Sequence, residues 1–532
     1  MAVLAPRARQ ADSPTAPRRG LRSALLRLLA DPRRLLLLVA ALVAFGACVD
    51  VLQDPDLWWH LRLGQWILDN HAVPHAEMFT FTAAGNAMTA HEWGSEVLFT
   101  LLARVGGVLL VAVVMGLVAW GGLLALAARA RLRGAGPVAL ALALLVGARA
   151  AEPVLGTRPQ VFTFALICAA LLVAERHLAR GTRWIWALPP AVMVGANLHG
   201  GFVLVLVALG LLLGLEAVRR VAGRPGAAPW SRLRSLGLVL ALAALAACLN
   251  AYGPGIYPYA LSTSAAVHAE PITEWQPPNF SDLSNLGLLV MLVSFAALLA
   301  LGGRLHLRDL GMSVIGFAAA LMAVRNTSLA VAFALPAWAS LAHQVGSRWG
   351  SSRWVRGVSR RTSPARRDAD ATGLPRSLGA PQWVAAAAIA CVGLVVPAVT
   401  VARAAEQASA SGIATTYPAC AASALHGTPG VRLVAPYFHS GYLAEQLWPD
   451  THVFIYGEAA SLGPAVFSAY QRIYAGGPDA MAMLQSHDAN AVLTPPGALQ
   501  ATLAGAPQWH RVLTDPTGLT LYSTLPLQPS TC

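Results

Sequence analysis

The residues best suited to chemistry lie in one polar segment, 54–96, which follows the first long apolar run of the chain. It opens with two aspartates separated by a single proline, and it closes with the sequence His-Glu-Trp-Gly-Ser-Glu. Carboxylates beside a membrane-length apolar run are costly and are usually functional. The candidate residues of this segment are Asp54, Asp56, His60, Arg62, His91, Glu92 and Glu96.

The two aspartates could do any of three kinds of chemistry. A carboxylate can act as a general base, orient an acceptor, or help to hold a divalent metal such as Mg²⁺ or Mn²⁺. The later cluster is not the His-Glu-x-x-His motif of zinc proteases, because Ser95 stands where the second histidine would be, which disfavours a zinc hydrolase. If a metal binds, the sequence offers Asp54, Asp56, His91 and Glu96 as its ligands.

The elements that must position these residues are membrane helices. Of the 532 residues, 56% are hydrophobic and only 12% are charged, with a mean hydropathy of +0.56; soluble domains carry about 25% charged residues. The composition therefore predicts a polytopic α-helical membrane protein of about eleven spans. The apolar runs cover 35–52, 108–128, 136–147, 160–174, 184–196, 201–217, 235–250, 284–302, 309–323, 327–345 and 382–402.

The charge pattern predicts the orientation of these spans. Every basic residue is arginine, and with the N-terminus inside, 29 of the 38 arginines fall in inner segments, as the positive-inside rule requires. The net charge of +13 thus indicates membrane topology rather than a nucleic-acid partner. We expect a disordered basic cytoplasmic segment at 1–34, a basic cytoplasmic loop at 346–381 and a long outer loop at 53–107, in the inner membrane of a cell.

Further polar residues occupy the short loops of the outer side. They are Arg158, Asn197, His199, Glu274, Arg325 and Asn326. Because topology brings these loops to one membrane face, we expect them to line an outward cavity together with the first loop. Arg158 and Arg325 could bind phosphate, which matches the guanidinium fork; alternatively they form ion pairs with Glu152 or Glu274, and the cluster fixes helix ends.

The texture of the chain changes at about residue 411. Strand-like runs at 431–435, 452–456, 491–494, 511–513 and 519–523 alternate with helical runs at 441–447, 465–474, 479–486 and 498–503. This alternation predicts a small α/β domain over 411–532, on the outer side. It holds Cys420 and Cys532, which an oxidising exterior would allow to form a disulfide; the other four cysteines lie in apolar spans.

Several motifs resemble those of the GT-C superfamily of integral-membrane glycosyltransferases, which includes oligosaccharyltransferases, protein O-mannosyltransferases and aminoarabinose transferases. The motifs are Asp-Pro-Asp-Leu-Trp-Trp-His-Leu-Arg (54–62), His-Glu-Trp (91–93), Arg-Pro-Gln (158–160), Asn-Leu-His-Gly-Gly-Phe (197–202), Glu-Trp-Gln-Pro-Pro-Asn-Phe (274–280) and Arg-Asn (325–326). More closely, they are similar to a bacterial GT-C-like family that ends in a small outer α/β domain. Where that family has an Asp-Gly-Arg-like turn after the second strand, this chain has Tyr456-Gly457-Glu458.

The resemblance implies a function. A GT-C enzyme takes a sugar from a lipid donor, commonly linked through polyprenyl phosphate, and uses a first-loop acid as base or acceptor anchor; Asp54 or Asp56 matches that acid. The implied partners are membrane lipids, a polyprenyl-phosphate-linked sugar and a cell-envelope glycan, lipid or protein acceptor. Two alternatives remain: a transporter or flippase of an envelope precursor, with broken helices at 184–217, and a catalytically silent membrane scaffold.

Overall fold

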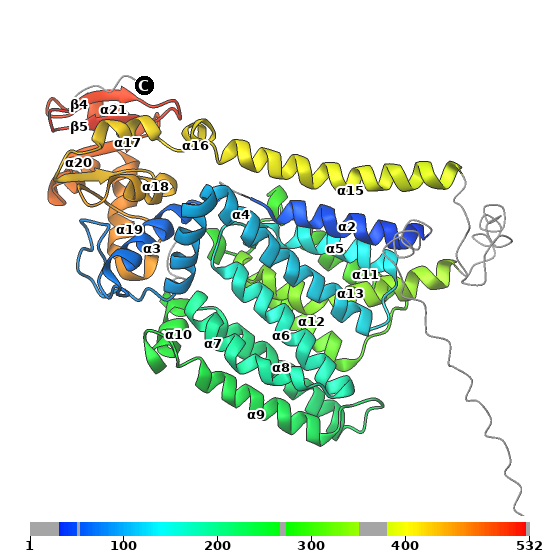
Figure 1. Cartoon of the computed structure of the whole chain (residues 1–532). Coiled ribbons are helices and arrows are strands. Elements are labelled where there is room, and N and C mark those ends of the chain that lie inside the picture. Colours follow the sequence, from blue (N-terminus) through cyan, green and yellow to red (C-terminus); the bar gives the residue numbers. More distant parts are fainter. Residues whose placement is uncertain (1–30, 51–53, 267–272, 351–379, 528–532) are drawn as a thin grey trace, which may run out of the picture.

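The computed structural model describes residues 31–50, 54–266, 273–350 and 380–527 (Figure 1). The first thirty residues of the predicted N-terminal segment, most of the predicted 346–381 loop, and Cys532 lie outside the described residues. Cys420 is disulfide-bonded. Because Cys532 is not described, its pairing with Cys420 stays a prediction.

Apolar helices form a bundle that makes up most of the molecule (Figure 1). Their local sequences explain where some of them begin: the Asp31 carboxylate accepts the Arg33 N–H at 3.1 Å and caps the first helix, and Pro32 and Pro137 stand in first turns, where no N–H is needed. The helices of the bundle are α2 (Pro32–Cys48), α4 (Trp93–Leu132), α5 (Pro137–Ala151), α6 (Gln160–Arg180), α7 (Leu188–Leu198), α8 (Phe202–Val221), α9 (Trp230–Ala246), α11 (Leu286–Ala300), α12 (Leu307–Met322), α13 (Thr327–Gly350) and α15 (Ala380–Gln407).

The predicted membrane character is confirmed, whereas the count of eleven spans stays a prediction. All eleven apolar runs lie largely within helices, but six helices of the described chain are long and apolar enough to cross a membrane, or seven if one bent pair counts as a span. The shortfall has a simple cause. Helices of 16 or 17 residues, such as α2, α9 and α12, reach only about 25 Å at 1.5 Å per residue, less than the ~30 Å hydrocarbon layer.

The polar segment that follows α2 folds into α3 (Leu57–Asn70) and an extended return to α4. Helix α3 packs closely on the start of α4, and Gly64 makes the approach possible. A Cβ at Gly64 would lie 2.1 Å from the Glu96 carbonyl oxygen and 2.4 Å from Thr100 Oγ1. The missing side chain therefore brings the polar faces of the two helices together.

The C-terminal residues form a five-stranded sheet with the order β2-β1-β3-β5-β4. The strands are β1 (Val431–Val434), β2 (Thr451–Val453), β3 (Ala491–Thr494), β4 (His510–Thr514) and β5 (Thr520–Ser523). The first three are parallel, and β5 and β4 add an antiparallel edge. The helices of the domain are α16 (Ala410–Thr416), α17 (Ala419–Leu425), α18 (Tyr437–Leu447), α19 (Ala459–Ala475), α20 (Pro478–Ser486) and α21 (Ala498–Ala504). The predicted α/β domain is thus confirmed.

The C-terminal domain docks on the first loop at one end of the bundle, where α3 contacts α18 (Figure 1). Arg62 Nη2 donates to the Trp448 carbonyl at 2.7 Å, and the Trp448 indole donates to the Met78 carbonyl at 2.9 Å. A parallel bridge joins Thr80 to Val453. The first loop and the domain therefore form a single cap, as expected of segments on one face of a membrane.

Candidate functional site

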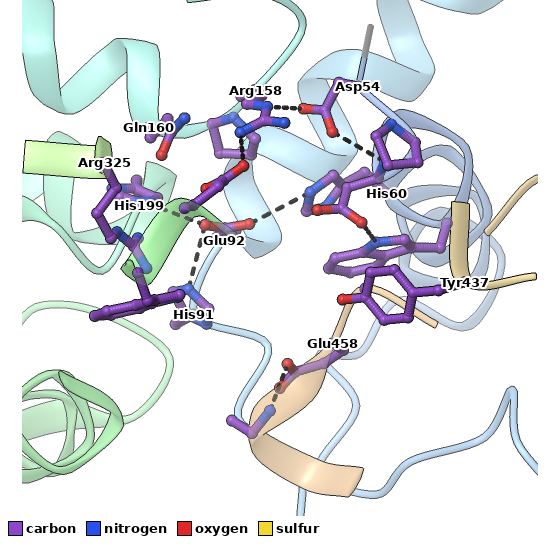
Figure 2. Close-up of a pocket in the computed structure, with 18 of the residues that line it drawn as sticks. Asp54, His60, His91, Glu92, Arg158, Gln160, His199, Arg325, Tyr437 and Glu458 are labelled. Carbon is purple, nitrogen blue, oxygen red and sulfur yellow. Dashed lines mark hydrogen bonds and ion pairs between the residues drawn. The ribbon is translucent and has the colours of Figure 1, made fainter. Parts of the chain in front are cut away.

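A cavity of about 440 Å³ opens between the end of the helix bundle and this cap (Figure 2). Its walls come from the first loop, the start of α6, the turn between α7 and α8, helix α10 (Ile256–Ala266), the segment before α11, the turn before α13, and the C-terminal domain. The lining residues are Asp54, Pro55, Asp56, Trp59, His60, His91, Glu92, Arg158, Pro159, Gln160, His199, Tyr259, Glu274, Trp275, Arg325, Tyr437, Phe438, Gly457, Glu458 and Ala460. Nine of the thirteen predicted catalytic and substrate-binding residues therefore share one cavity.

Both aspartates face this cavity, but they are held differently. Asp54 accepts the backbone N–H of Asp56 at 3.0 Å and forms an ion pair with Arg158 at 2.8 Å. Asp56 precedes the first turn of α3 and accepts a hydrogen bond from the Trp59 indole at 3.1 Å. Asp54 is therefore bound to a permanent cation, whereas the bond to Asp56 comes from a neutral donor.

This difference appears in the two pKa values. Burial raises the pKa of Asp54 to about 6, against the opposing charge of Arg158. Burial raises the pKa of Asp56 to about 8, and the neighbouring Asp54 carboxylate adds to the rise. Of the two carboxyls, Asp56 therefore has the higher affinity for a proton at neutral pH.

The guanidinium of Arg158 is neutralised by two carboxylates. Besides Asp54, it pairs with Glu274. The predicted ion pair with Glu274 is thus observed, while Glu152 pairs with Arg149 at 2.6 Å. Arg158 therefore organises acids that come from two distant loops.

Glu92 lies at the centre of the polar wall, surrounded by three histidines (Figure 2). Its carboxylate lies 3.2 Å from His91 Nε2, 3.3 Å from His199 Nε2 and 3.5 Å from His60 Nε2. Burial alone would raise the pKa of Glu92, but the charge of His91 and its hydrogen bond bring that pKa below its usual value. Glu92 is therefore an anion that orders the imidazoles around it.

The tautomer of His199 follows from its hydrogen bonds. The Gly201 backbone N–H donates to His199 Nδ1 at 3.0 Å, so this nitrogen carries no proton in the neutral ring. The proton then lies on Nε2 and points at Glu92. Burial lowers the pKa of His199 to about 4, in agreement with a neutral ring. His199 is thus an oriented hydrogen-bond donor rather than a cation.

Arg325 is the second cation of the cavity, and its environment differs from that of Arg158. Its guanidinium lies over the Trp275 ring, 3.8 Å from the centroid. Within the described part of the chain it forms no ion pair with a carboxylate. A cation held in place by an aromatic face keeps its charge available for an anion.

The C-terminal domain supplies one wall, and its charged group is Glu458 (Figure 2). This residue caps α19 through the Ala460 N–H at 3.2 Å, and its buried Oε1 atom has no hydrogen-bond partner among the described residues. Burial raises the pKa of Glu458 to about 7. Gly457 approaches so closely that a Cβ there would lie 1.8 Å from Asp56 Oδ1.

The comparisons with known proteins concern the fold. No protein-family model matches the sequence, and no curated protein matches it. The oligosaccharyltransferase of Archaeoglobus fulgidus in its apo form is similar over 86% of this chain and 69% of its own, with 11% identity and a TM-score of 0.53. The same enzyme tethered to an acceptor peptide containing the NVT sequon is similar over 92% of this chain and 74% of its own, with 12% identity and a TM-score of 0.53. ArnT from Cupriavidus metallidurans in the apo state is similar over 95% of this chain and 99% of its own, with 15% identity and a TM-score of 0.50.

The chain has a GT-C fold. Both similar enzymes are glycosyltransferases of the GT-C superfamily, and the similarity extends over most of the chain. The resemblance expected from the motifs of the first loop is thus confirmed at the level of the fold. In this GT-C fold the candidate cavity lies between the helix bundle and the appended C-terminal domain.

Four of the predicted substrate-binding residues do not line the cavity. Arg62 binds the Trp448 carbonyl and lies over its ring, where it anchors the C-terminal domain. The Asn197 side chain accepts from the Trp93 indole and donates to two carbonyls, and the Asn326 side chain donates to the Ala319 carbonyl. Glu96 is buried beneath the cavity, against His60.

Three buried side chains at the base of the cavity could hold a metal. His60, Glu92 and Glu96 each offer a ligand atom within 4.8 Å of the other two, and His60 Nδ1 and Glu96 Oε2 have no hydrogen-bond partner in the part of the chain that the structure describes. Ligands at about 2.1 Å from a metal lie up to about 4.2 Å apart, so a small closure would bind an ion. Of the four metal ligands predicted from the sequence, this cluster of described residues contains Glu96 alone. Metal binding by the predicted ligands stays a prediction.

The sequence reasoning did not select Glu458 and Tyr437 as site residues. Both lie in the C-terminal domain, close after β2 and β1 respectively. Loops at the carboxyl ends of parallel strands often carry binding residues, and this was the signal available. The strand order does not predict that the domain docks against Asp56, so these two residues could not be placed in the cavity from the sequence.

Proposed function

We propose that this protein is a GT-C-type glycosyltransferase that takes a sugar from a polyprenyl-phosphate-type lipid donor and transfers it to a cell-envelope acceptor. The observation that carries the proposal is the pairing, in one cavity, of an aspartate whose pKa is raised by burial and an arginine that forms no ion pair with a carboxylate of the described residues. Asp56 supplies the first and Arg325 the second. Transfer from a lipid phosphate needs a base for the acceptor and a cation for the leaving phosphate.

In the proposed reaction, Asp56 is the general base. It takes the proton of the acceptor hydroxyl as the acceptor oxygen bonds to the anomeric carbon of the sugar. The bond from that carbon to the lipid-phosphate oxygen breaks, and the phosphate leaves with the electron pair. A pKa of about 8 suits a base at neutral pH, because efficient proton transfer requires a pKa near the working pH.

The other residues position charge around this step. Arg325 neutralises the phosphate as it leaves, an interaction that gains strength in a buried site. Arg158 holds Asp54 in place beside Asp56 and keeps Asp54 ionised more readily than Asp56. The His199 Nε2–H could donate a hydrogen bond to a sugar hydroxyl, and the Glu92 carboxylate could accept one from a sugar hydroxyl. If a divalent metal takes part, His60, Glu92 and Glu96 would hold it and it would supply positive charge.

The decisive test is replacement of each aspartate by asparagine, which keeps the shape but cannot take a proton. Asp56→Asn is expected to lower sugar transfer by about 10²–10⁴-fold, the usual contribution of a general base. Asp54→Asn is expected to lower it less, because Asp54 acts through its neighbour. The assay is transfer of radiolabelled sugar to envelope material in membranes from cells that express each variant at matched levels.

The control is Asp69→Asn, since Asp69 lies in the last turn of α3, the helix that follows Asp56, and is exposed outside the cavity. It should leave transfer unchanged. Full activity of both cavity variants and of the double variant would refute the enzyme, and the transporter or scaffold alternative would then take its place.

A further inference from the structure

A second hollow lies at the end of the helix bundle opposite the candidate site. It is an open groove bordered by α2, α4, α5 and α6 and has a volume of about 970 Å³. Helix α6 connects the two places, because Gln160 at its start lines the catalytic cavity and Arg180 at its end lines the hollow. Its 21 residues separate them by about 30 Å, so the hollow cannot share a ligand headgroup with the site.

The walls of the hollow are apolar along the helices and basic at one end. They contain alanines and leucines of three helices together with four arginines, and no carboxylate. The lining residues are Arg34, Leu37, Leu38, Ala41, Leu124, Ala127, Ala128, Arg131, Leu132, Pro137, Leu140, Leu144, Arg176 and Arg180. The hollow therefore combines space for a hydrocarbon chain with a group of cations.

Three carboxylates at this end of the bundle are already paired with arginines that do not line the hollow. Glu175 binds Arg129 and Arg133, each at 2.7 Å, and Asp309 binds Arg133 at 2.9 Å. In the same way, Glu216 accepts from Arg219 at 2.7 Å. These acids stabilise the interior of the bundle and are not available to the arginines of the hollow.

Three arginines of the hollow consequently lack a counter-charge. Arg131, Arg176 and Arg180 are exposed, and none of them forms an ion pair with a carboxylate of the part of the chain that the structure describes. Arg176 and Arg180 stand four residues apart on α6, where like charges repel each other. Among the described residues, Arg34 is the one arginine of the hollow that pairs with an acid, Asp31, at 3.1 Å. An external anion would relieve this repulsion.

We propose that the hollow is a binding site for an anionic phospholipid. The lipid phosphate lies among Arg131, Arg176 and Arg180, and an acyl chain lies along the apolar walls of α2, α4 and α5. Guanidinium groups match phosphate oxygens, and basic pockets between membrane helices bind anionic headgroups. Arginines that only mark the edge of a bilayer would need no hollow between the helices. The proposal does not depend on the glycosyltransferase activity.

The test measures lipid binding to the purified full-length protein by native mass spectrometry. Phosphatidylglycerol, cardiolipin and phosphatidylcholine are each added to delipidated protein. The anionic lipids are expected to bind more tightly than phosphatidylcholine. The triple variant R131Q/R176Q/R180Q should weaken anionic-lipid binding about a hundredfold, because each arginine near an anionic lipid contributes about fivefold.

Two further variants separate charge from shape. The matched control R220Q/R224Q/R234Q removes three exposed arginines from the same end of the bundle, outside the hollow, and should bind lipid like the wild type. Ala128→Phe fills the hollow without changing its charge and should displace the lipid. Inorganic phosphate added in excess distinguishes a lipid site from a site for a free anion, and should not compete.

Specific outcomes overturn the proposal. They are equal binding of phosphatidylcholine, equal losses in the two triple variants, wild-type binding by Ala128→Phe, or full competition by inorganic phosphate. If the arginine triple variant fails to fold, Ala128→Phe decides by itself, because its charges are unaltered.

Discussion

At the scale of single residues, the candidate site depends on how each charge is partnered. Arg158 and Arg325 look equivalent in the sequence, yet one is neutralised by Asp54 and Glu274 while the other lies on Trp275. The same distinction separates the two aspartates, because only Asp54 has a permanent cation. These contacts are the reason for assigning the proposed chemistry to Asp56 and Arg325. Asp54 and Arg158 bind each other and hold the site in place.

The pH dependence of transfer should report Asp56 directly. The base acts only when it is deprotonated, so with a pKa of about 8 the rate should rise with pH up to about 8 and then level off. Trp59→Phe removes the hydrogen bond that favours the ionised form, so the pKa rises further and the midpoint moves up by about one pH unit. Transfer is measured from pH 5.5 to 9.5.

A merely structural role for Trp59 gives a different profile. In that case the Trp59→Phe variant would lose activity equally at every pH, with its midpoint unmoved. Trp66→Phe, on the same helix but outside the cavity, is the matched control. Its profile should coincide with that of the wild type.

The residues that sequence reasoning identified are those whose loops share a membrane face. Topology alone brought Asp54, Glu92, Arg158, Glu274 and Arg325 to one cavity. It could not give the direction of a side chain, and so Arg62, with the right chemical type, holds the Trp448 carbonyl instead. Contacts of this kind join residues 386 positions apart and depend on how two folded units fit.

At the scale of elements, the site depends on how α3 meets α4. Gly64 allows the α3 backbone to approach the Glu96 carbonyl, and this approach places His60 3.5 Å from the carboxylates of both Glu92 and Glu96. Sequence periodicity predicted a helix in this segment but not its distance from the next one. A single missing side chain therefore sets the spacing of the buried polar face.

Gly64→Ala should separate the two helices. The added methyl group would meet backbone and the Thr100 hydroxyl rather than the end of a flexible chain, so we expect a loss of about 1–3 kcal/mol of stability, as for other overpacked sites. Thermal unfolding of the detergent-purified protein is the measurement. The matched control is Gly121→Ala in α4, where a Cβ meets nothing within 4 Å. Equal unfolding temperatures for the two variants would contradict this role of Gly64.

At the scale of the whole molecule, the C-terminal domain and the first loop close the same end of the bundle, and the arginine hollow lies at the other. The α/β order of the domain could be predicted, since its strands and helices alternate along the chain within about a hundred residues. The number of membrane spans could not, because several helices are close to the limiting length. The arginine distribution bears on a separate property, the side of the membrane that each end faces.

This distribution predicts that the cap faces the outside of the cell. Single cysteines are introduced at exposed alanines, Ala72 in the first loop, Ala504 in the C-terminal domain and Ala222 at the opposite end, in a background without the four free cysteines. A membrane-impermeant maleimide should label the first two positions in intact cells and the third only after the cells are opened. Exposed sites differ little in intrinsic reactivity, so accessibility decides the labelling. Labelling of Ala222→Cys alone in intact cells would reverse the predicted topology. The proposed transfer would then take place on the cytoplasmic face, in conflict with the positive-inside rule.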